Sequence, residues 1–257
     1  MANILDKYGI KEVADVTFYE IDDNGKPTTP VLYLDTLKVS TIEQTAEQAD
    51  ARGGKGNPKL ITWDYNKEIT VTLEDALFSA KSMAVMFGNS TVSTATVSLK
   101  KTIVFTGTTD AGHGVPTYWE GPQGKKYQIS SVSDSTKVKY YTASGSTVGY
   151  ANLQADTQYY MVFETTTKEA GTIEIDQNSF PGTYYITGDT YARSDVTGDD
   201  EFFQFIIPKA KMSSENTITL EAEGDPSVFN MNLTVLKAPG QPLMKLVKYD
   251  LTEMAES

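Results

Sequence analysis

Residues 41–88 read TIEQTAEQADARGGKGNPKLITWDYNKEITVTLEDALFSAKSMAVMFG, and this stretch decides the fold that the sequence predicts. Its first part, residues 43–58, has almost no large apolar side chain and carries charges of both signs and several glycines, which predicts a long polar loop. Loops of that length inside a compact chain are typically functional or disordered. Residues 60–63 and 68–72 are rich in β-branched and aromatic side chains, and residues 64–67 are typical of a turn. We therefore expect a β-hairpin behind the loop.

A single helix is predicted directly after this hairpin. Thr72 occupies an N-cap position, and Glu74 and Asp75 follow where negative charge opposes the positive end of the helix dipole. Apolar residues then recur at steps of three and four, at Leu73, Ala76, Leu77, Ala80, Met83, Ala84 and Phe87. Gly88 is the expected C-terminal stop. The pattern predicts a helix over residues 74–87 with one buried stripe.

The rest of the chain predicts strands. Residues 1–12 have mixed polarity and suggest an N-terminal arm, and residues 254–257 suggest a polar tail. Strand patterns separated by Gly, Pro, Asp and Asn occur at residues 13–21, 31–39, 102–106, 138–141, 159–163, 171–175, 182–189, 202–208, 217–222, 228–236 and 244–251. The predicted fold class is therefore mainly β: a β-sandwich or barrel with a single flanking α-helix, a long polar loop and an all-β insertion.

The insertion is placed by a change in composition. Residues 107–167 are rich in Gly and Tyr, and turn signals recur in them at the short intervals typical of small all-β domains. We expect residues 1–106 and 168–257 to form the sandwich, and residues 107–167 to be a β-rich insertion or an elaborated face of the same sandwich.

Charge and composition narrow the classes of partner. The chain of 257 residues has 22 Lys and Arg against 34 Asp and Glu, a net charge of −12, and no cysteine. Such a surface repels nucleic acid, so specific DNA or RNA binding is not expected. An acidic surface of this kind either keeps the protein soluble or lets DNA pass without binding. No signal peptide or membrane segment is expected, and the absence of cysteine fits assembly in a reducing cytoplasm.

The motifs of enzymes and metal sites are incomplete. The sole histidine, His113 in DAGHG, is typical of a solvated loop. GGKGNP at residues 53–58 lacks the preceding strand, the Ser or Thr after the lysine, and the following helix of a phosphate-binding loop. Paired carboxylates of a glycoside hydrolase are defined by spatial rather than sequence spacing, and nothing in the sequence supports them. We expect no catalytic activity and no cofactor.

Two acidic runs are candidate metal sites. Asp22, Asp23 and Asn24 form a run shorter than a calcium loop, without its terminal Glu. The second run consists of Asp195, Asp199, Asp200 and Glu201. Hairpin turns collect Asp and Asn for backbone reasons, so we interpret both runs as turns and expect no metal.

Two stretches resemble a known family. Residues 41–88 and EFFQFIIPKAKMSSENTITLEAEGDPSVFNMNLTVL at residues 201–236, roughly a third of the chain, are similar to the major tail tube proteins and related virion structural proteins of long-tailed bacteriophages. The resemblance implies a β-sandwich with one flanking helix, whose subunits form hexameric rings that stack into a hollow tube. It also implies a protein of the virion tail, assembled in the host cytoplasm.

The resemblance also assigns roles to residues of this chain. The loop at residues 41–58 would bridge one ring to the next, with Glu43, Arg52, Lys55 and Asn57 as inter-ring contacts. The implied partners are other copies of the chain, other tail proteins and DNA that passes an acidic inner wall without specific binding. No membrane partner is implied. Residues 107–167 depart from the simplest version of this plan.

Three other readings remain open. A receptor- or carbohydrate-binding virion protein would use the aromatic-rich residues 115–165, including Trp119. A capsid decoration protein would sit on heads rather than tails. An unrecognised hydrolase is disfavoured by the missing catalytic motifs.

Overall fold

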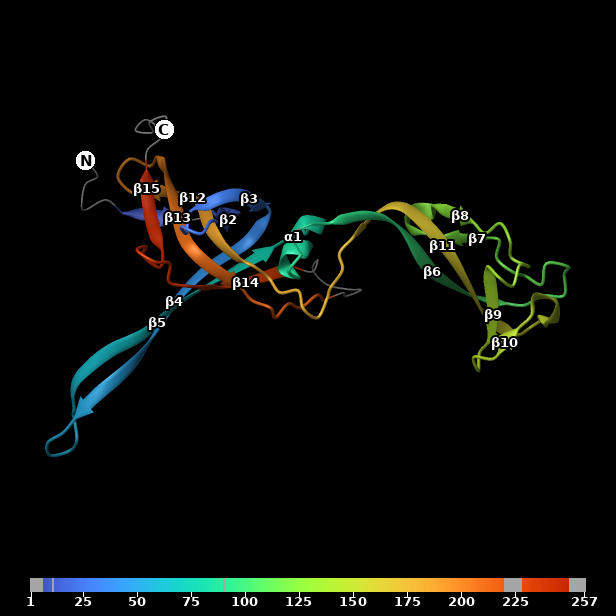
Figure 1. The fold of residues 1–257 in the computed structure, drawn as a ribbon, viewed down its shortest axis with the longest axis horizontal. Coiled ribbons are helices and arrows are strands. Elements are labelled where there is room, and N and C mark those ends of the chain that lie inside the picture. Colours follow the sequence, from blue (N-terminus) through green and yellow to red (C-terminus); the bar gives the residue numbers. More distant parts are fainter. Residues whose placement is uncertain (1–6, 11, 90, 220–227, 250–257) are drawn as a thin grey trace. The chain divides into compact units, whose positions relative to one another are not determined.

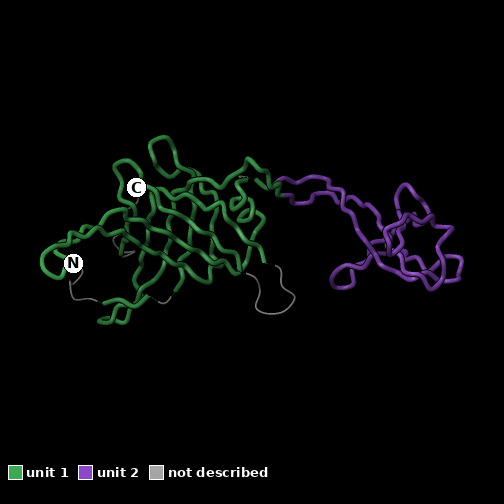
Figure 2. Tube along the Cα trace, turned by 90° about the horizontal axis from the view of Figure 1, so that it is seen from below, with its two compact units in different colours: residues 1–92, 173–257 green, residues 93–172 purple. Residues whose placement is uncertain are grey.

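The computed structural model describes residues 7–10, 12–89, 91–219 and 228–249. The chain divides into two compact units, shown in Figure 2: unit 1 comprises residues 1–92 and 173–257, and unit 2 comprises residues 93–172. The sequence placed these boundaries at residues 107 and 167. The difference arises because two long strands, β6 (Ser93–Thr106) and β11 (Gln158–Thr172), pair along their whole length and so belong together to unit 2.

Unit 1 is built on one antiparallel sheet of nine strands, so the mainly β prediction with one α-helix is confirmed in the described residues. The strand order is β3-β2-β12-β13-β14-β5-β4, with β1 on β12 and β15 on β13. The strands are β1 (Tyr8–Ile10), β2 (Asp15–Ile21), β3 (Pro27–Leu34), β4 (Leu37–Arg52), β5 (Lys59–Asp75), β12 (Thr183–Ser194), β13 (Asp200–Met212), β14 (Phe229–Val235) and β15 (Lys245–Tyr249).

The sheet is curled by a short connection between its two outer strands. β3 and β4 stand at opposite ends of the strand order, yet only Asp35 and Thr36 separate them in sequence. Two residues span too little distance to cross a flat sheet, so the sheet must curl until its ends approach. Leu34 and Leu37, on either side of this corner, are both buried. The single strand that the sequence predicted at residues 31–39 is therefore two strands.

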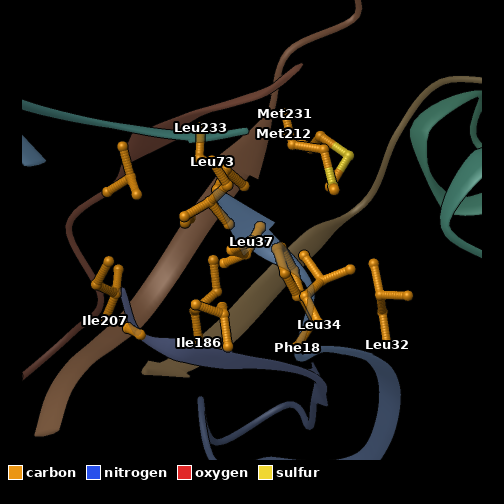
Figure 3. Close-up of a cluster of buried hydrophobic side chains, with 14 of the residues drawn as sticks. Phe18, Leu32, Leu34, Leu37, Leu73, Ile186, Ile207, Met212, Met231 and Leu233 are labelled. Atoms are coloured by element: carbon orange, nitrogen blue, oxygen red, sulfur yellow. The ribbon is translucent and has the colours of Figure 1, made fainter. Parts of the chain in front are cut away.

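The curled sheet encloses the core of unit 1, part of which is shown in Figure 3. Alternate residues of each strand point inward, as the period of two requires. The largest fully buried side chains of this cluster are Phe18, Leu73, Met86, Ile186, Ile207, Met212, Met231 and Leu233. Val85 and Met86 join the cluster from the single α-helix, α1 (Ala80–Met86), which contacts β3.

The helix is shorter than predicted and begins later. Ser79 is the N-cap, and its side chain exchanges hydrogen bonds with Ser82 in a capping box. Leu73 lies in β5 instead, because it pairs with Met231 of β14 and with Ser40 of β4. Sheet pairing therefore overrides the helical spacing. The predicted stop is correct: Gly88 has a φ of +84°, and a Cβ there would lie 2.5 Å from the carbonyl carbon of Phe180.

The predicted long loop is wrong. Residues 43–52 continue β4, and residues 59–68 belong to β5, so only residues 53–58 form a connection. The expected turn at residues 64–67 is also absent, because β5 passes through it with a bulge. Polar residues at 43–52 adopt a strand because β5 supplies the partners for their backbone groups, a condition that local sequence does not reveal.

Unit 2 contains a four-stranded sheet with the order β10-β9-β11-β6 and a separate two-stranded sheet of β7 and β8. Its further elements are β7 (Tyr118–Glu120), η1 (Pro122–Gly124), β8 (Lys126–Gln128), β9 (Val138–Thr142), β10 (Thr147–Val148) and η2 (Tyr150–Asn152). One face of the larger sheet packs on a second core that includes Tyr140, Tyr159, Met161 and Phe163.

Several smaller predictions need correction. Tyr8–Ile10 is not a free arm, since it pairs with β12. Of the strand predicted at 171–175, only residues 171 and 172 are extended, at the end of β11. Residues 217–219 lie outside any strand, whereas residues 220–222 and the expected tail at 254–257 lie outside the described residues. In the described part of the chain, no helix has the length and apolarity needed to cross a membrane.

A hydrogen bond at the β3–β4 corner gives a first prediction. The Thr36 hydroxyl donates to Oδ1 of Asp75 at 2.6 Å, and Asp75 is only 2% exposed. Thr36→Val leaves that carboxylate short of a donor, so we expect the free energy of unfolding to fall by about 1–3 kcal/mol. Urea denaturation measures the change.

Thr72→Val is the matched control, because the Thr72 hydroxyl donates to Asn232 at the exposed surface. We expect it to cost less than about 0.5 kcal/mol. Equal losses in the two variants would contradict a special role for the corner.

Candidate assembly interface

The outer part of the β4–β5 hairpin, residues 43–68, extends beyond the core of unit 1, and we call it the arm. It projects from the curled sheet of unit 1 in Figure 1. Almost every residue of the arm is exposed, whereas β5 alternates between buried and exposed from Ile69 onward. A two-stranded ribbon with no layer against it is at best marginally stable in water. The arm therefore has surface available for a partner.

One face of the arm is apolar. Ile61, Trp63 and Tyr65 alternate along β5 and are 53%, 54% and 46% exposed. Residues directly opposite each other in an antiparallel pair share a face. Their partners on β4 are Ala51, Ala49 and Glu47, respectively. The arm thus exposes a stripe of adjacent apolar side chains to solvent. Such a contiguous patch is less common on a protein surface than single scattered apolar residues.

A β-bulge determines which face this stripe occupies. Between the pairs Thr45–Glu68 and Glu47–Tyr65, β5 has one residue more than β4, and Asn66 within it has a φ of +50°. One extra residue reverses the alternation of a strand. Ile69 points into the core of unit 1, so Tyr65 lies on the opposite face of the hairpin.

The other face of the arm is held by polar contacts. Gln48 Nε2 donates to Asp64 at 2.9 Å, and the Thr62 hydroxyl donates to Asp50 at 2.9 Å. Lys59 Nζ lies 2.9 Å from Asp50 Oδ1. Hydrogen bonds from Lys59, and next from Thr62, hold the pKa of Asp50 below its usual range. These cross-strand contacts keep the two strands in register where no core supports them.

The four predicted contact residues do not form one cluster. Glu43 lies at the base of the arm, opposite Thr70. Arg52 ends β4 and pairs with Asp50 at 3.3 Å. Lys55 and Asn57 lie in the tip, where Asn57 donates its N–H to the Gly54 carbonyl. GGKGNP is this hairpin tip. Sequence analysis missed the stripe, although the alternation in ITWDY at residues 61–65 is its signal.

The remaining sequence candidates have structural roles. The His113 ring contacts Tyr150 edge to face, with centroids 5.2 Å apart. Asp22 accepts the N–H groups of Asn24 and Lys26 in the β2–β3 turn, and these bonds, that of Lys26 foremost, lower its pKa.

The second acidic run is divided among different partners. Asp195 accepts from the Lys7 N–H, Asp200 forms a two-bond pair with Arg193 at 2.7 and 2.8 Å, and Glu201 pairs with Lys248. Over the described ranges, no group of three or more acidic, His or Cys side chains could hold a metal ion.

A second surface of interest is the outer face of the sheet around β3, β2 and β12. Asp15 and Asp189 are direct cross-strand partners, an unfavourable placement for two negative charges. Neutral donors stabilise them: Tyr33 donates to Asp15, and Gln204 and Tyr249 donate to Asp189. The charge of Asp15 in turn raises the pKa of the Tyr33 hydroxyl. This acidic sheet face concentrates negative charge away from the core.

The polar face of the arm gives a prediction about pH. Because the Asp50 pKa is lowered in the folded arm, its contacts stabilise the arm above the unfolded pKa, about 3.9, and are lost as pH falls through the folded value. A carbon-detected NMR titration should find the Asp50 pKa below that unfolded value. Lys59→Met should raise it more than Thr62→Val does, since the hydrogen bond from Lys59 is the largest cause. An unchanged pKa in both variants would show that the polar face is not formed in solution.

Comparison with curated protein sequences gives no match to this chain. Comparison with protein families matches residues 8–243 to the YomU/Tube protein family. The match spans both units, and it includes the arm and the acidic sheet face. Since it covers most of the sequence, this chain belongs to the YomU/Tube protein family.

Proposed function

We propose that this protein is the tail tube subunit of a long-tailed bacteriophage, a structural protein that forms hexameric rings and stacks them into a tube that conducts DNA. Membership of the YomU/Tube family supports a tube protein in general. The observation that carries the specific proposal is the arm, a long hairpin with an uncovered apolar stripe. In this proposal the protein has no catalytic role, and it functions in the virion tail after assembly in the host cytoplasm.

The stripe has the composition of an assembly contact. Large aromatic side chains such as Trp63 and Tyr65 dominate the energetics of interfaces, because they bury much area with few rotatable bonds. A ribbon one layer thick cannot cover such side chains itself. In the proposal, the arm of one subunit lies against a subunit of the next ring, which buries the stripe. The contact set then centres on Ile61, Trp63 and Tyr65, and the earlier candidates Arg52, Lys55 and Asn57 lie beyond it at the tip.

The distribution of charge supports a DNA-conducting role for unit 1. Unit 2 has seven lysines and six carboxylates, a net charge of +1, so the remaining −13 of the chain belongs to unit 1. Within unit 1, the acidic sheet face carries Asp15 and Asp189 side by side. Such a face repels the phosphate backbone. We propose that it lines the tube, so that DNA slides past without binding.

The stripe can be tested with two substitutions in β5. Trp63→Ser removes the centre of the stripe, whereas Leu60→Ser removes another exposed apolar side chain of the arm that lies outside the stripe. Both side chains are exposed, so neither variant should lose its fold. An interface aromatic contributes roughly 2 kcal/mol, so we expect Trp63→Ser to raise the protein concentration needed for tubes by at least about tenfold.

Light scattering and negative-stain microscopy across a concentration series measure this. Leu60→Ser should assemble as the unchanged protein does. Tubes that form equally well with Trp63→Ser would remove the stripe from the stacking contact.

The proposed lumen wall can be located directly, because the chain has no cysteine that would compete for a label. Tyr33 is 57% exposed on the acidic sheet face, so Tyr33→Cys accepts a maleimide-linked gold cluster. We expect gold within the central channel of labelled tubes in electron micrographs. Leu246→Cys, on exposed β15, controls for labelling in general. Gold from Tyr33→Cys on the outer surface would contradict this placement of the acidic face.

A further inference from the structure

The outer face of the four-stranded sheet in unit 2 carries side chains that do not suit an ordinary solvated surface. The inner face packs on the core through alternate residues such as Val138, Tyr140 and Met161. The intervening residues point outward. Among them, Val104 is 58% and Tyr160 is 41% exposed. Exposed sheet faces are normally polar, so the apolar and aromatic content of this face calls for an explanation.

Strand register arranges these outward residues in rows. Tyr160 of β11 pairs with Tyr141 of β9 on one side and with Val104 of β6 on the other, which forms an aromatic row. In the next row, Val162 lies between Lys139 and Thr102. Directly opposed residues share a face, so Lys139 adjoins the aromatic row on the same surface.

Two pockets adjoin β9, the strand that carries Lys139 and Tyr141. The larger, about 420 Å³, is lined by three lysines, Lys100, Lys137 and Lys139, together with Tyr141, Val162 and Glu164. The smaller, about 270 Å³, shares Lys139 and Tyr141 with it. Its remaining lining comes from the edge of the sheet and includes the core-facing Val138 and Tyr140, Tyr150, and the hydroxyl groups of Ser133, Ser135 and Thr147. Lys139 and Tyr141 thus line both pockets, and we call the lining of the two pockets together the track.

The lysines of the track are not all neutralised by carboxylates. Lys100 pairs with Glu164 at 3.2 Å. Lys139 forms no ion pair within the described residues, and it lies between the two pockets. The track therefore offers positive charge within a chain whose net charge is −12. That placement favours an anionic ligand.

We propose that this track binds an anionic glycan, a sugar chain that bears carboxylate or phosphate groups. Sugar rings stack on Tyr141 and Tyr160, the anionic group pairs with Lys139, and the serine and threonine hydroxyls bond to sugar hydroxyls. Pockets with aromatic walls and a few convergent polar groups are typical ligand sites. This role is separate from tube formation, since it uses residues of unit 2 alone.

The track suits a glycan better than nucleic acid. A nucleic acid strand carries a charge on every nucleotide and depends on many cationic contacts. Unit 2 contains no arginine, and one of the three lysines is paired. A glycan with sparse charge needs only a few cations. The aromatic-rich region was the sequence-based candidate for carbohydrate binding, but Trp119 is not on this track, since Lys101 covers its ring at 4.6 Å and it packs against the core.

The test uses the full-length protein and isothermal titration calorimetry. The probes are hexagalacturonate, phosphate-bearing pentamannose, the neutral sugar maltohexaose and a single-stranded dT12. We expect one of the two anionic sugars to bind at least about tenfold more tightly than maltohexaose, and more tightly than dT12. Lys139→Glu should weaken that binding at least about tenfold, since it replaces an attraction by a repulsion.

Two further variants separate the site from general charge. Tyr141→Ala should weaken binding of the anionic sugar with no change in net charge. Lys125→Glu, an exposed lysine outside both pockets, makes the same charge change as Lys139→Glu and should leave the affinity within about twofold. Circular dichroism checks that each variant is folded. The proposal is overturned if neither anionic sugar binds at about 10 mM, if dT12 binds best, or if Lys139→Glu and Lys125→Glu have equal effects.

Discussion

The pairing of β4 with β5 is the constraint on which the rest of unit 1 depends. It starts in the core, where Leu37 lies opposite the buried Asp75, and continues to the pair Arg52–Lys59 at the tip of the arm. Near its base, β5 also pairs with β14 and so joins the arm to the sheet. Because the same two strands form part of the core and the whole of the arm, their pairing within the curled sheet sets the direction and twist of the arm. A separate loop would lack this rigid connection.

The bulge at Asn66 reverses which face of the hairpin the alternate side chains of β5 occupy. Without the extra residue, the odd-numbered residues of β5 would face the same way along the whole strand. With it, Ile69 faces the core, whereas Trp63 faces away from it. The hairpin can thus bury one face at its base and present an apolar stripe on the other face farther out. Bulges commonly redirect side chains in this way at functional surfaces.

The two units divide the chain's chemistry between them. Unit 1 holds the excess of carboxylates, including the adjacent pair Asp15 and Asp189, and has an uncovered stripe on its arm. Unit 2 is nearly neutral and has a track of tyrosines and lysines on an open sheet face. The negative charge of unit 1 would repel DNA phosphates, which suits a surface that DNA passes. Unit 2 is nearly neutral and carries lysines on its track that have no ion pair among the described residues, which suits an anionic ligand. The proposed tube and the proposed glycan site thus rest on different units.

The sequence by itself determined the broad class of this protein. The many β-branched and aromatic segments between turn residues predict a mainly β fold, and the helical spacing up to Gly88 predicts one helix with the correct end. The change in composition located a Gly- and Tyr-rich region but not the ends of unit 2, because β6 and β11 extend beyond it in register. The sequence also lacks complete catalytic motifs, and its resemblance to tail tube proteins predicts a structural role. Each of these features depends on residues that are close together in the chain, so the sequence alone predicts it.

Tertiary structure decided the features that depend on partners distant in sequence. Residues 43–52 form a strand only because β5 supplies hydrogen-bond partners for their backbone groups. Both faces of β4 are exposed in the arm, so its sequence has no alternation of large apolar and polar residues that would predict a strand. Leu73 fits a helical stripe as well as a strand, and pairing with Met231 of β14 selects the strand. The stripe of Ile61, Trp63 and Tyr65 was visible as an alternation, but its face depends on register with β4. Register and pairing arise from contacts between segments, so only the folded chain could settle them.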